Sequence, residues 1–228
     1  MGIISIIVPT FNEAQNISLL IPKIHDVLNG NYKHEIVVVD DNSPDGTAKV
    51  ARSLAKKHNV RVLLRKNKRG LSSAVIDGFK FAKGDTLCVM DADLSHPPDV
   101  LPKVLDALKH ADLVVGSRLV KGGGSEEWPF HRKLLSWGAQ LLARPLTPVK
   151  DTMSGFFAMK RSVIKDISLE AYGYKILLEI LVMGHYNKVV EVPFTFLNRS
   201  FGSSKIGVGV EAEYLKQLGH LYKYKFSK

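Results

Sequence analysis

Asp91 and Asp93 are the residues whose type and spacing most directly suggest chemistry. They follow an apolar run in the stretch VMDADLSHPP, residues 89–98, and a Ser-His-Pro-Pro break comes directly after them. On an extended strand, residues i and i+2 point to the same face, about 6.6 Å apart along the chain. Two carboxylates this close repel, so a proton or a cation must accompany them. Mg²⁺ or Mn²⁺ shared with substrate phosphates would resolve the repulsion, and a solvated strand end is the simpler alternative.

Acidic residues also follow two earlier strands, because Glu13 comes just after the first apolar run and Asp40 and Asp41 end the second. The predicted strands cover residues 3–10, 34–41, 60–66, 85–93 and 112–118, and the predicted helices between them cover 13–29, 43–58, 70–84 and 97–110. Apolar strands that alternate with helices indicate an α/β fold with a mainly parallel central sheet and helices on both faces. Ligands of such sheets bind beyond the carboxyl ends of the strands, where these acids lie.

Local signals refine a few of these elements. Ser43 is expected to cap the helix over 43–58, with Pro44 at its first position. In the less regular second half, we expect a glycine-rich loop at 121–130, amphipathic helices at 131–146 and 209–226, and a late strand at 188–199. His96 precedes two prolines, so we expect it to serve the entry into the next helix.

Composition narrows the class of protein. The chain has 228 residues, is 45% hydrophobic and carries a formal net charge of +10, which suits an anionic partner such as a phosphate-bearing substrate, a nucleic acid or an acidic membrane surface. No recognised nucleic-acid motif or stacking platform is present, so a nucleic-acid partner is not expected. The single cysteine, Cys88, is expected in the core and fits a reducing compartment. No stretch is long and apolar enough to span a bilayer.

The motifs and their order carry a family resemblance. VPTFNE, VVDDNSPDGT, GLSSAV, VMDADLSHPP and VGSR occur in this order in the first half, and KGGGSEEWPFHRKLLSWGA, DTMSGFFAMKR, GYKILLEIL and VVEVPFTFLNRSFGSSK follow in the second. The set resembles the inverting family-2 glycosyltransferases with a GT-A (Rossmann-like) fold, and the later segments resemble the dolichol-phosphate mannose synthases. The resemblance implies a single GT-A domain over 1–228, with a nucleotide-sugar half at 1–120 and an acceptor half with interface helices at 121–228.

The resemblance also implies roles for individual residues. It implies a nucleotide-sugar site made by Pro9, Phe11, Glu13, Val38, Asp40, Asp91, Ala92, Asp93, Arg118, Lys175, Arg199 and Lys205. It implies catalytic roles for Asp91, Asp93, Arg118, Arg132, Ser136 and Arg199, with Arg132 and Ser136 at the acceptor phosphate. The implied metal ligands are Asp91, Asp93 and Ser95, and the short Ser95 hydroxyl favours a contact through water. A packed turn at Pro9 and Phe11, or a solvated charge at Lys175, remains the simpler alternative.

The implied reaction moves mannose from GDP-mannose to dolichyl or polyprenyl phosphate with inversion, using Mg²⁺ or Mn²⁺. The acceptor phosphate is already anionic at neutral pH, because its second pKa is about 6, so no strong enzymic base is expected. The enzyme is expected to be peripheral on the cytoplasmic face of a membrane, where small transmembrane subunits could be partners. The alternatives are a polyprenyl-phosphate glucosyltransferase that uses UDP-glucose, and a non-catalytic nucleotide-binding module at a membrane surface.

Overall fold

The computed structural model describes residues 2–126, 130–170, 175–199, 201 and 210–227, and for residues 130–136, 210 and 211 it describes the backbone alone. The strands in chain order are β1 (Ile4–Thr10), β2 (His34–Asp40), β3 (Val60–Leu64), β4 (Thr86–Val89), β5 (Leu113–Ser117), β6 (Gly124–Ser125), β7 (Phe157–Lys160), β8 (Val189–Pro193) and β9 (Thr195–Phe196). The helices are α1 (Ala14–Leu28), α2 (Thr47–His58), α3 (Leu71–Phe81), α4 (Leu101–Leu108), α5 (Phe130–Ala143), α6 (Ile176–Met183) and α7 (Val210–Phe226), with short 3₁₀ turns η1 (Pro98–Val100) and η2 (Arg161–Ile164).

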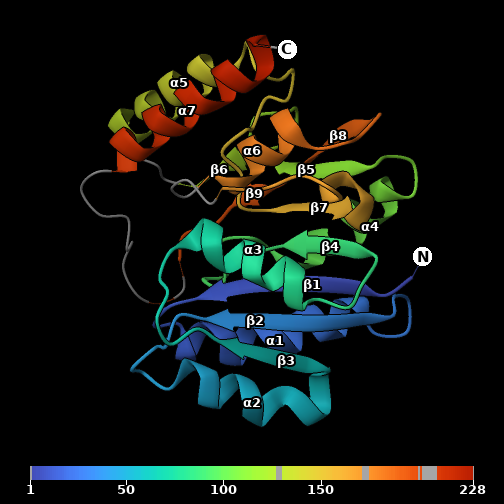
Figure 1. Cartoon of the computed structure of the whole chain (residues 1–228). Helices are drawn as coiled ribbons and strands as arrows, with labels where there is room; N and C mark the ends of the chain where they lie inside the picture. The colour runs from blue at the N-terminus through green and yellow to red at the C-terminus, as the bar shows by residue number, and fades with distance from the viewer. Residues whose placement is uncertain (1, 127–129, 171–174, 200, 202–209, 228) are drawn as a thin grey trace.

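A seven-stranded sheet with the order β3-β2-β1-β4-β7-β5-β8 forms the central layer (Figure 1). The pairs β3–β2, β2–β1, β1–β4 and β5–β8 are parallel, whereas β7 is antiparallel to both of its neighbours. The predicted α/β fold with a mainly parallel sheet is therefore confirmed. Because β7 and β8 come from the second half of the sequence and join strands of the first half, one sheet runs through both halves. The division at residue 120 stays a prediction.

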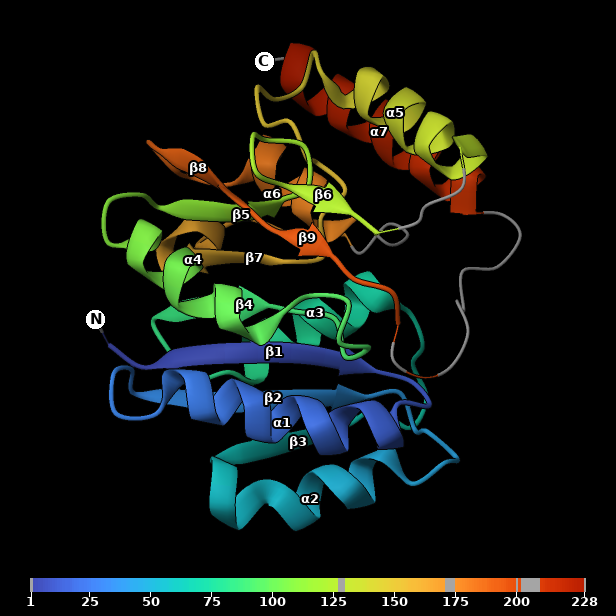
Figure 2. The ribbon, with the colours of Figure 1, turned by 180° about the vertical axis from the view of Figure 1, so that it is seen from behind.

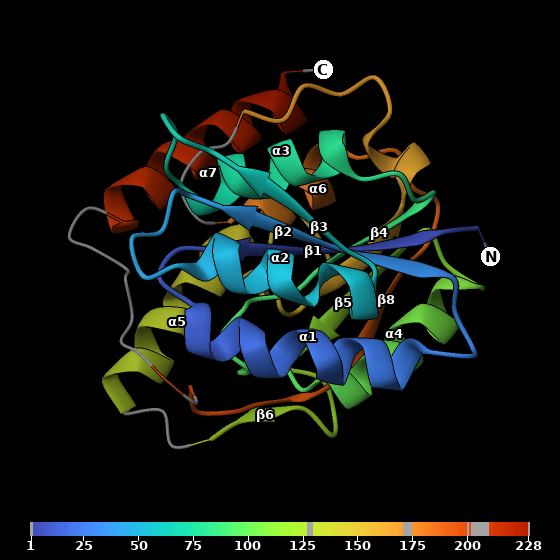
Figure 3. The same ribbon diagram turned by 90° about the horizontal axis from the view of Figure 1, so that it is seen from below.

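Alternating side chains along the strands build a core on each face of the sheet. Ile6, Val38 and Cys88 pack with α1 and α4 on one face, whereas Ile7 and Leu87 pack with α3 and α6 on the other. All five side chains are fully buried, and Figure 3 shows these two pairs of helices on opposite sides of the sheet. Continuous apolar strands are thus explained by burial on both faces, and Cys88 is the core residue that the sequence predicts.

Three boundaries differ from the sequence expectations. The Ser43 cap is wrong, since α2 begins only at Thr47 and Ser43 instead donates to Asp40 through both its amide and its hydroxyl. The strand expected to carry both acids ends at Val89, so the acids follow in a turn that contains Leu94 at φ 64°. The late strand expected over 188–199 is divided into β8 and β9, and β9 pairs with β6 in a separate small sheet.

The helices α5 and α7 form a separate layer beyond the β8 edge of the sheet, at the opposite end from α2 (Figures 1 and 2). Tyr214 and Tyr222 of α7 donate to the carbonyls of Ala139 and Leu142 in α5, at 2.6 and 2.7 Å. Buried Ala143, Leu146, Leu178, Leu218 and Leu221 connect this pair to α6. Among the described residues, no helix has both the length and the apolar character needed to cross a membrane.

Candidate active site

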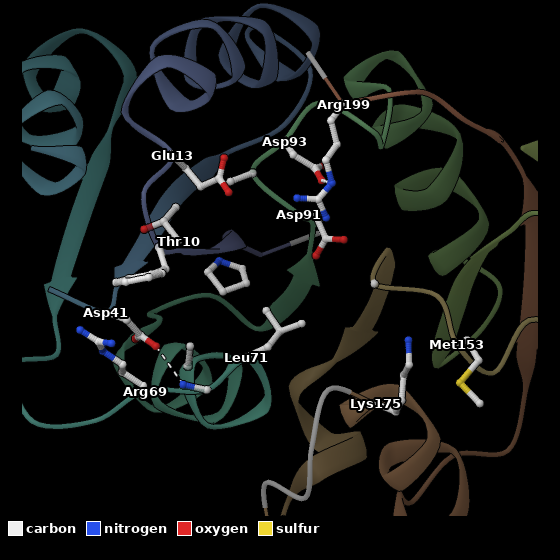
Figure 4. Close-up of a pocket in the computed structure, with 16 residues that line it drawn as sticks. Thr10, Glu13, Asp41, Arg69, Leu71, Asp91, Asp93, Met153, Lys175 and Arg199 are labelled. Atoms are coloured by element: carbon white, nitrogen blue, oxygen red, sulfur yellow. Dashed lines mark hydrogen bonds and ion pairs between the residues drawn. The ribbon is translucent and has the colours of Figure 1, made fainter. Parts of the chain in front are cut away.

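A cavity of about 380 Å³ lies at the carboxyl ends of β1, β2 and β4, where ligands of parallel sheets bind (Figure 4). The acids that end these strands in the sequence contribute to its wall. The lining residues are Pro9, Thr10, Phe11, Glu13, Asp41, Arg69, Gly70, Leu71, Ala74, Asp91, Ala92, Asp93, Met153, Gly155, Lys175 and Arg199. Charged groups of both signs therefore line one hollow together with apolar side chains.

Asp91 and Asp93 both reach this cavity but have different surroundings. Asp91 has a side chain that is 32% exposed, whereas that of Asp93 is 5% exposed. Asp93 accepts hydrogen bonds from the amide and the hydroxyl of Ser95 at one oxygen, and its other oxygen lies 3.1 Å from Nε of Arg199. Ser95 is fully buried, so its hydroxyl orients Asp93 in this structure. A role for Ser95 as a ligand to a cation through water stays a prediction.

His96 holds the other acid in place, which differs from the helix-entry role expected for it. Its Nδ1 accepts the backbone N–H of Asp91 at 3.1 Å, which assigns the remaining proton of the neutral ring to Nε2, 3.8 Å from the Asp91 carboxylate. The ring is buried against Phe156, Phe194 and Phe196. Burial lowers the pKa of His96, so this geometry is that of a neutral imidazole.

Gly155 lies against the Asp91 carboxylate. A Cβ atom on this glycine would stand 2.9 and 3.0 Å from the two oxygens of Asp91, so even an alanine would displace them. The glycine belongs to the segment DTMSGFF, which the sequence analysis identified as a family motif without assigning a residue to the site. Its absence of a side chain leaves room for the acid to face the cavity.

On the opposite side of the cavity, Asp41 lies beside Arg69 (Figure 4). The guanidinium of Arg69 lies 4.8 Å from the centre of the Phe11 ring, a cation–π contact. Asp41 accepts from the Gly70 amide at 3.0 Å and pairs with buried Arg65 at 2.6 Å. Burial lowers the pKa of Arg65, but hydrogen bonds to Asp41 and to Asp77 outweigh it, so the net shift is upward. Arg65 thus stays charged and anchors the loop that carries Arg69.

Three of the residues expected at the nucleotide sugar lie elsewhere. Val38 is fully buried in the core, where it packs with α1 and does not reach the cavity. Asp40 is also fully buried and accepts from Thr10 and Ser43, so the next residue, Asp41, lines the cavity in its place. Arg118 does not line the cavity either.

Arg118 instead forms a two-pronged ion pair with Asp151. Its Nε and Nη2 donate to the two carboxylate oxygens at 2.8 and 2.7 Å, and its backbone amide donates as well. Asp151 is fully buried, and the Arg118 side chain is 10% exposed. The structure therefore gives Arg118 a partner inside the protein, whereas the family resemblance implied a place in the nucleotide-sugar site.

The other predicted residues divide into two groups. Pro9, Phe11, Glu13, Asp91, Ala92, Asp93, Lys175 and Arg199 line the cavity as expected, and their roles in binding stay predictions. The side chains of Arg132 and Ser136 lie outside the described part of the structure, as does Lys205. Arg69 was not predicted from the sequence, although its place shortly after a predicted strand, in NKRG, is a usable signal.

The donor set of the cavity fits a hard divalent cation only together with a substrate. The described residues contain no group of three or more His, Cys, Asp or Glu side chains that could hold a metal ion alone. Asp91 and Asp93 offer carboxylate oxygens at the cavity wall, and Mg²⁺ or Mn²⁺ is commonly held by one or two carboxylates plus substrate phosphates. The residues present are therefore compatible with a cation that is shared with a bound phosphate.

This arrangement of a mainly parallel sheet, with a cavity walled by Asp-x-Asp and cations at its carboxyl ends, defines a GT-A glycosyltransferase fold. The sequence model for "Glycosyl transferase family 2" matches residues 5–168. The chain belongs to glycosyl transferase family 2. A solved structure of glucosyl-3-phosphoglycerate synthase from Mycobacterium tuberculosis, in complex with Mn²⁺, UDP-glucose and glycerol 3-phosphate, superposes with a TM-score of 0.70. That match covers 98% of this chain and 80% of the other at 20% identity, so it supports the fold alone.

Closer relatives in sequence are dolichol-phosphate mannosyltransferases. The chain is 49% identical to that of Pyrococcus furiosus over 97% of its own length, but it spans only 64% of the length of that relative. It is 40% identical to the dolichol-phosphate mannosyltransferase of Saccharomyces cerevisiae, covering 97% of this chain and 88% of the yeast protein. The undecaprenyl-phosphate mannosyltransferase of Micrococcus luteus is 37% identical, over 91% of this chain and 88% of that protein.

Proposed function

We propose that the chain transfers mannose from GDP-mannose to the phosphate of dolichol or another polyprenol, with inversion at the anomeric carbon. The observation that carries the proposal is the cavity at the strand ends, which Asp91 and Asp93 line together with Arg199 and Lys175. The names of relatives at 37–49% identity, which specify dolichol phosphate or undecaprenyl phosphate and a mannosyl group, support the sugar and the class of acceptor.

The two sides of the cavity suit the two parts of a nucleotide sugar. Phe11 and Arg69 offer flat surfaces for a nucleobase, and Glu13 offers oxygens that accept hydrogen bonds from a base edge or a ribose. Arg199 and Lys175 supply positive charge for a diphosphate, which guanidinium groups bind through paired N–H donors. The donor would therefore extend from the Phe11 side to the Asp91 side.

Asp91 and Asp93 would hold a divalent cation together with the diphosphate. When bound, such a cation supplies positive charge that stabilises the nucleoside diphosphate as a leaving group. Ser95 and His96 support this arrangement from within the protein, since one orients Asp93 and the other fixes the backbone of Asp91. Both Mg²⁺ and Mn²⁺ prefer the oxygen donors that these two acids offer.

The acceptor phosphate would act as its own nucleophile. Its second pKa of about 6 leaves it as a dianion at neutral pH, so proton removal by an enzymic base is not required for attack. The remaining task for the protein is to bring two anionic substrates together, which rests on positioning and on charge neutralisation. The formal net charge of +10 supports such a role for the chain.

The α5–α7 layer would bring the cavity to the bilayer that contains the polyprenol tail. Its exposed large apolar side chains include Trp137 and Leu141 on α5 and Leu215 and Phe226 on α7, which are 55–63% exposed. Amphipathic helices of this kind lie in the membrane interface with their apolar groups inserted, and nearby basic residues bind anionic lipid. We therefore place the protein at a membrane surface as a peripheral enzyme.

A panel of donors and acceptors tests the proposed function. Purified protein is incubated with labelled GDP-mannose or UDP-glucose, a polyprenyl phosphate and Mg²⁺ or Mn²⁺, and label is counted in the lipid fraction. We expect lipid-linked label from GDP-mannose, no label when the free polyprenol replaces its phosphate, and no label in EDTA. If only UDP-glucose gave lipid-linked label, the transferred sugar would be glucose and not mannose. If neither donor gave lipid-linked label, transfer to a polyprenyl phosphate would be refuted.

A further inference from the structure

Residues 197–199 and 201 pass beside the cavity and contact three residues of the first half of the chain. The amide of Leu197 donates to the carbonyl of Ser95 at 3.0 Å, and Nε of Arg199 lies 3.1 Å from Oδ2 of Asp93. The side chain of Asn16 in α1 donates to the carbonyl of Phe201 at 3.3 Å. Figure 4 shows the Arg199 side chain extending from this segment toward the two acids. The segment thus positions one guanidinium directly on the Asp-x-Asp turn.

The contact with Arg199 completes the set of partners around Asp93. One carboxylate oxygen of Asp93 is taken by the amide and the hydroxyl of Ser95, and the other faces Arg199. A carboxylate that is only 5% exposed is costly to leave without an opposite charge, and Arg199 supplies that charge here. The oxygen that faces Arg199 is also the one left for a cation, because Ser95 occupies the first.

We propose that Arg199 takes the place of the divalent cation at Asp93 when no nucleotide is bound, so that Arg199 and the cation compete for Oδ2 of this residue. The inference rests on the proposed function, because it requires that a cation and a diphosphate bind in this cavity. Both competitors are positively charged and use the same oxygen, so they exclude each other at Asp93.

The competition makes cation binding depend on the nucleotide. The apparent affinity of a ligand is reduced in proportion to the fraction of protein molecules whose site is free to bind it. The ion pair of Arg199 with Asp93 keeps this fraction small for the cation. A diphosphate offers Arg199 new oxygens for paired hydrogen bonds and offers the cation additional ligands. Each of these effects favours joint binding, and linkage requires the nucleotide to bind more tightly with the cation by the same factor.

The affinity for Mn²⁺, measured from the electron paramagnetic resonance signal of the free ion, tests this without any turnover. In nucleotide-free protein, Arg199→Gln is expected to bind Mn²⁺ about tenfold more tightly than the wild type, because the competing charge is gone. Arg69→Gln is the matched control. It removes the same charge from the same cavity, on the side away from Asp93, and is expected to change the Mn²⁺ affinity less than about twofold.

Addition of GDP separates the inference from the proposed function. The wild type is expected to gain Mn²⁺ affinity on addition of GDP by about tenfold or more, and Arg199→Gln is expected to gain less, because its Asp93 is already free. Equal Mn²⁺ affinities of the wild type and Arg199→Gln without GDP would overturn the competition while leaving the proposed function intact. If Arg69→Gln and Arg199→Gln raised the Mn²⁺ affinity of the nucleotide-free protein by the same factor, the competition would also be overturned. Failure of the wild type to bind Mn²⁺ even with GDP would refute both the inference and the cation in the proposed function.

Discussion

Asp91 and Asp93 are separated by one residue but differ in exposure and in the groups that surround them. Asp91 is open to the cavity and lies against Gly155 and His96, whereas Asp93 is buried between Ser95 and Arg199. The sequence predicted that the two carboxylates converge, and the family resemblance implied that they hold a cation, which stays a prediction. It could not predict the asymmetry, because β4 ends at Val89 and the turn that follows gives the two side chains different neighbours.

At the scale of one residue, a substitution of Gly155 tests whether mannosyl transfer depends on the position of the Asp91 carboxylate. In Gly155→Ala, the new Cβ would meet the Asp91 carboxylate at under 3.0 Å and push it out of place. We expect kcat/KM for mannosyl transfer to fall about tenfold to a hundredfold, as for other small misplacements of reacting groups. The unfolding midpoint in urea should change little, because a side-chain tip can move aside.

Gly138→Ala is the matched control for that substitution, since a Cβ at Gly138 meets nothing within 4 Å. This position lies in α5, where alanine favours the helix, so activity should be unchanged and stability equal or slightly higher. A Gly155→Ala enzyme with the activity of the wild type would mean that Asp91 works from a position other than the one in this structure.

At the scale of elements, the ion pair of Arg118 with Asp151 joins the end of β5 to the loop before β7. Because the Asp151 side chain is fully buried, removing its partner leaves an uncompensated charge inside the protein. Arg118→Gln is expected to lower the free energy of unfolding by about 3 kcal/mol, measured by urea denaturation. This result would assign Arg118 to the stability of the fold.

The exposed pair of Lys160 with Asp112 serves as the comparison, because the Lys160 side chain is 46% exposed. Lys160→Gln should cost less than about 1 kcal/mol, as surface ion pairs generally do. If both substitutions changed stability equally and Arg118→Gln abolished transfer, Arg118 would instead have the role in the nucleotide-sugar site that the family resemblance implied.

Glu179 in α6 gives the fold a pH dependence of defined sign. Burial raises the pKa of this carboxyl above 4.5, and the amide of Glu170 and the nearby His220 oppose that shift only in part. A group whose folded-state pKa is raised stabilises the fold below its unfolded pKa, and this contribution is lost as the pH rises through the folded value. Glu179→Gln keeps an acceptor for the Glu170 amide but cannot ionise.

We therefore expect Glu179→Gln to raise the urea midpoint relative to the wild type at about pH 7, with a difference that shrinks toward about pH 4. Glu213→Gln, at an exposed position of α7, is the matched control for the loss of one carboxylate. A difference for Glu179→Gln that is constant over this range would show that folding leaves the pKa of Glu179 unchanged, and a difference that grows as the pH falls would show that folding lowers it.

The elements themselves were predictable where periodicity was strong and less so where a turn or a crossing strand decided the structure. The first five strands and four helices of the sequence analysis all exist, because continuous apolar runs and amphipathic spacing reflect burial on both faces of the sheet. The start of α2 was missed because Ser43 donates to Asp40, three residues before it, instead of capping the helix. The antiparallel insertion of β7 between β4 and β5 depends on long-range pairing, which a local pattern does not reveal.

At the scale of the whole molecule, the cavity and the α5–α7 layer must serve the same reaction if the acceptor is a lipid. Leu141 on α5 is 55% exposed and should insert into the bilayer, whereas Leu19 on α1 is 44% exposed and lies on a helix of the main sheet. Leu141→Ser is expected to weaken co-sedimentation with anionic liposomes by about fivefold or more, and Leu19→Ser should leave it unchanged.

Salt should weaken the same binding only in part, since basic groups such as Arg144, Lys216 and Lys223 contribute about 1 kcal/mol each near an anionic surface. The apolar part is insensitive to salt. Equal loss from both leucine substitutions, or no binding to liposomes of any composition, would mean that the exposed side chains of α5 and α7 are not a membrane contact.

The central claim is that Asp91, at the carboxyl end of the sheet, takes part in moving mannose to a lipid phosphate. The most direct measurement is the rate at which labelled mannose passes from GDP-mannose into polyprenyl phosphate, with saturating Mg²⁺, for the wild type, Asp91→Asn and Asp99→Asn. Asp99 lies close by in the same loop, at the start of η1, but is exposed. The account predicts that Asp91→Asn lowers the rate by about a hundredfold or more while Asp99→Asn matches the wild type. An Asp91→Asn enzyme that transfers mannose at the rate of the wild type would contradict it.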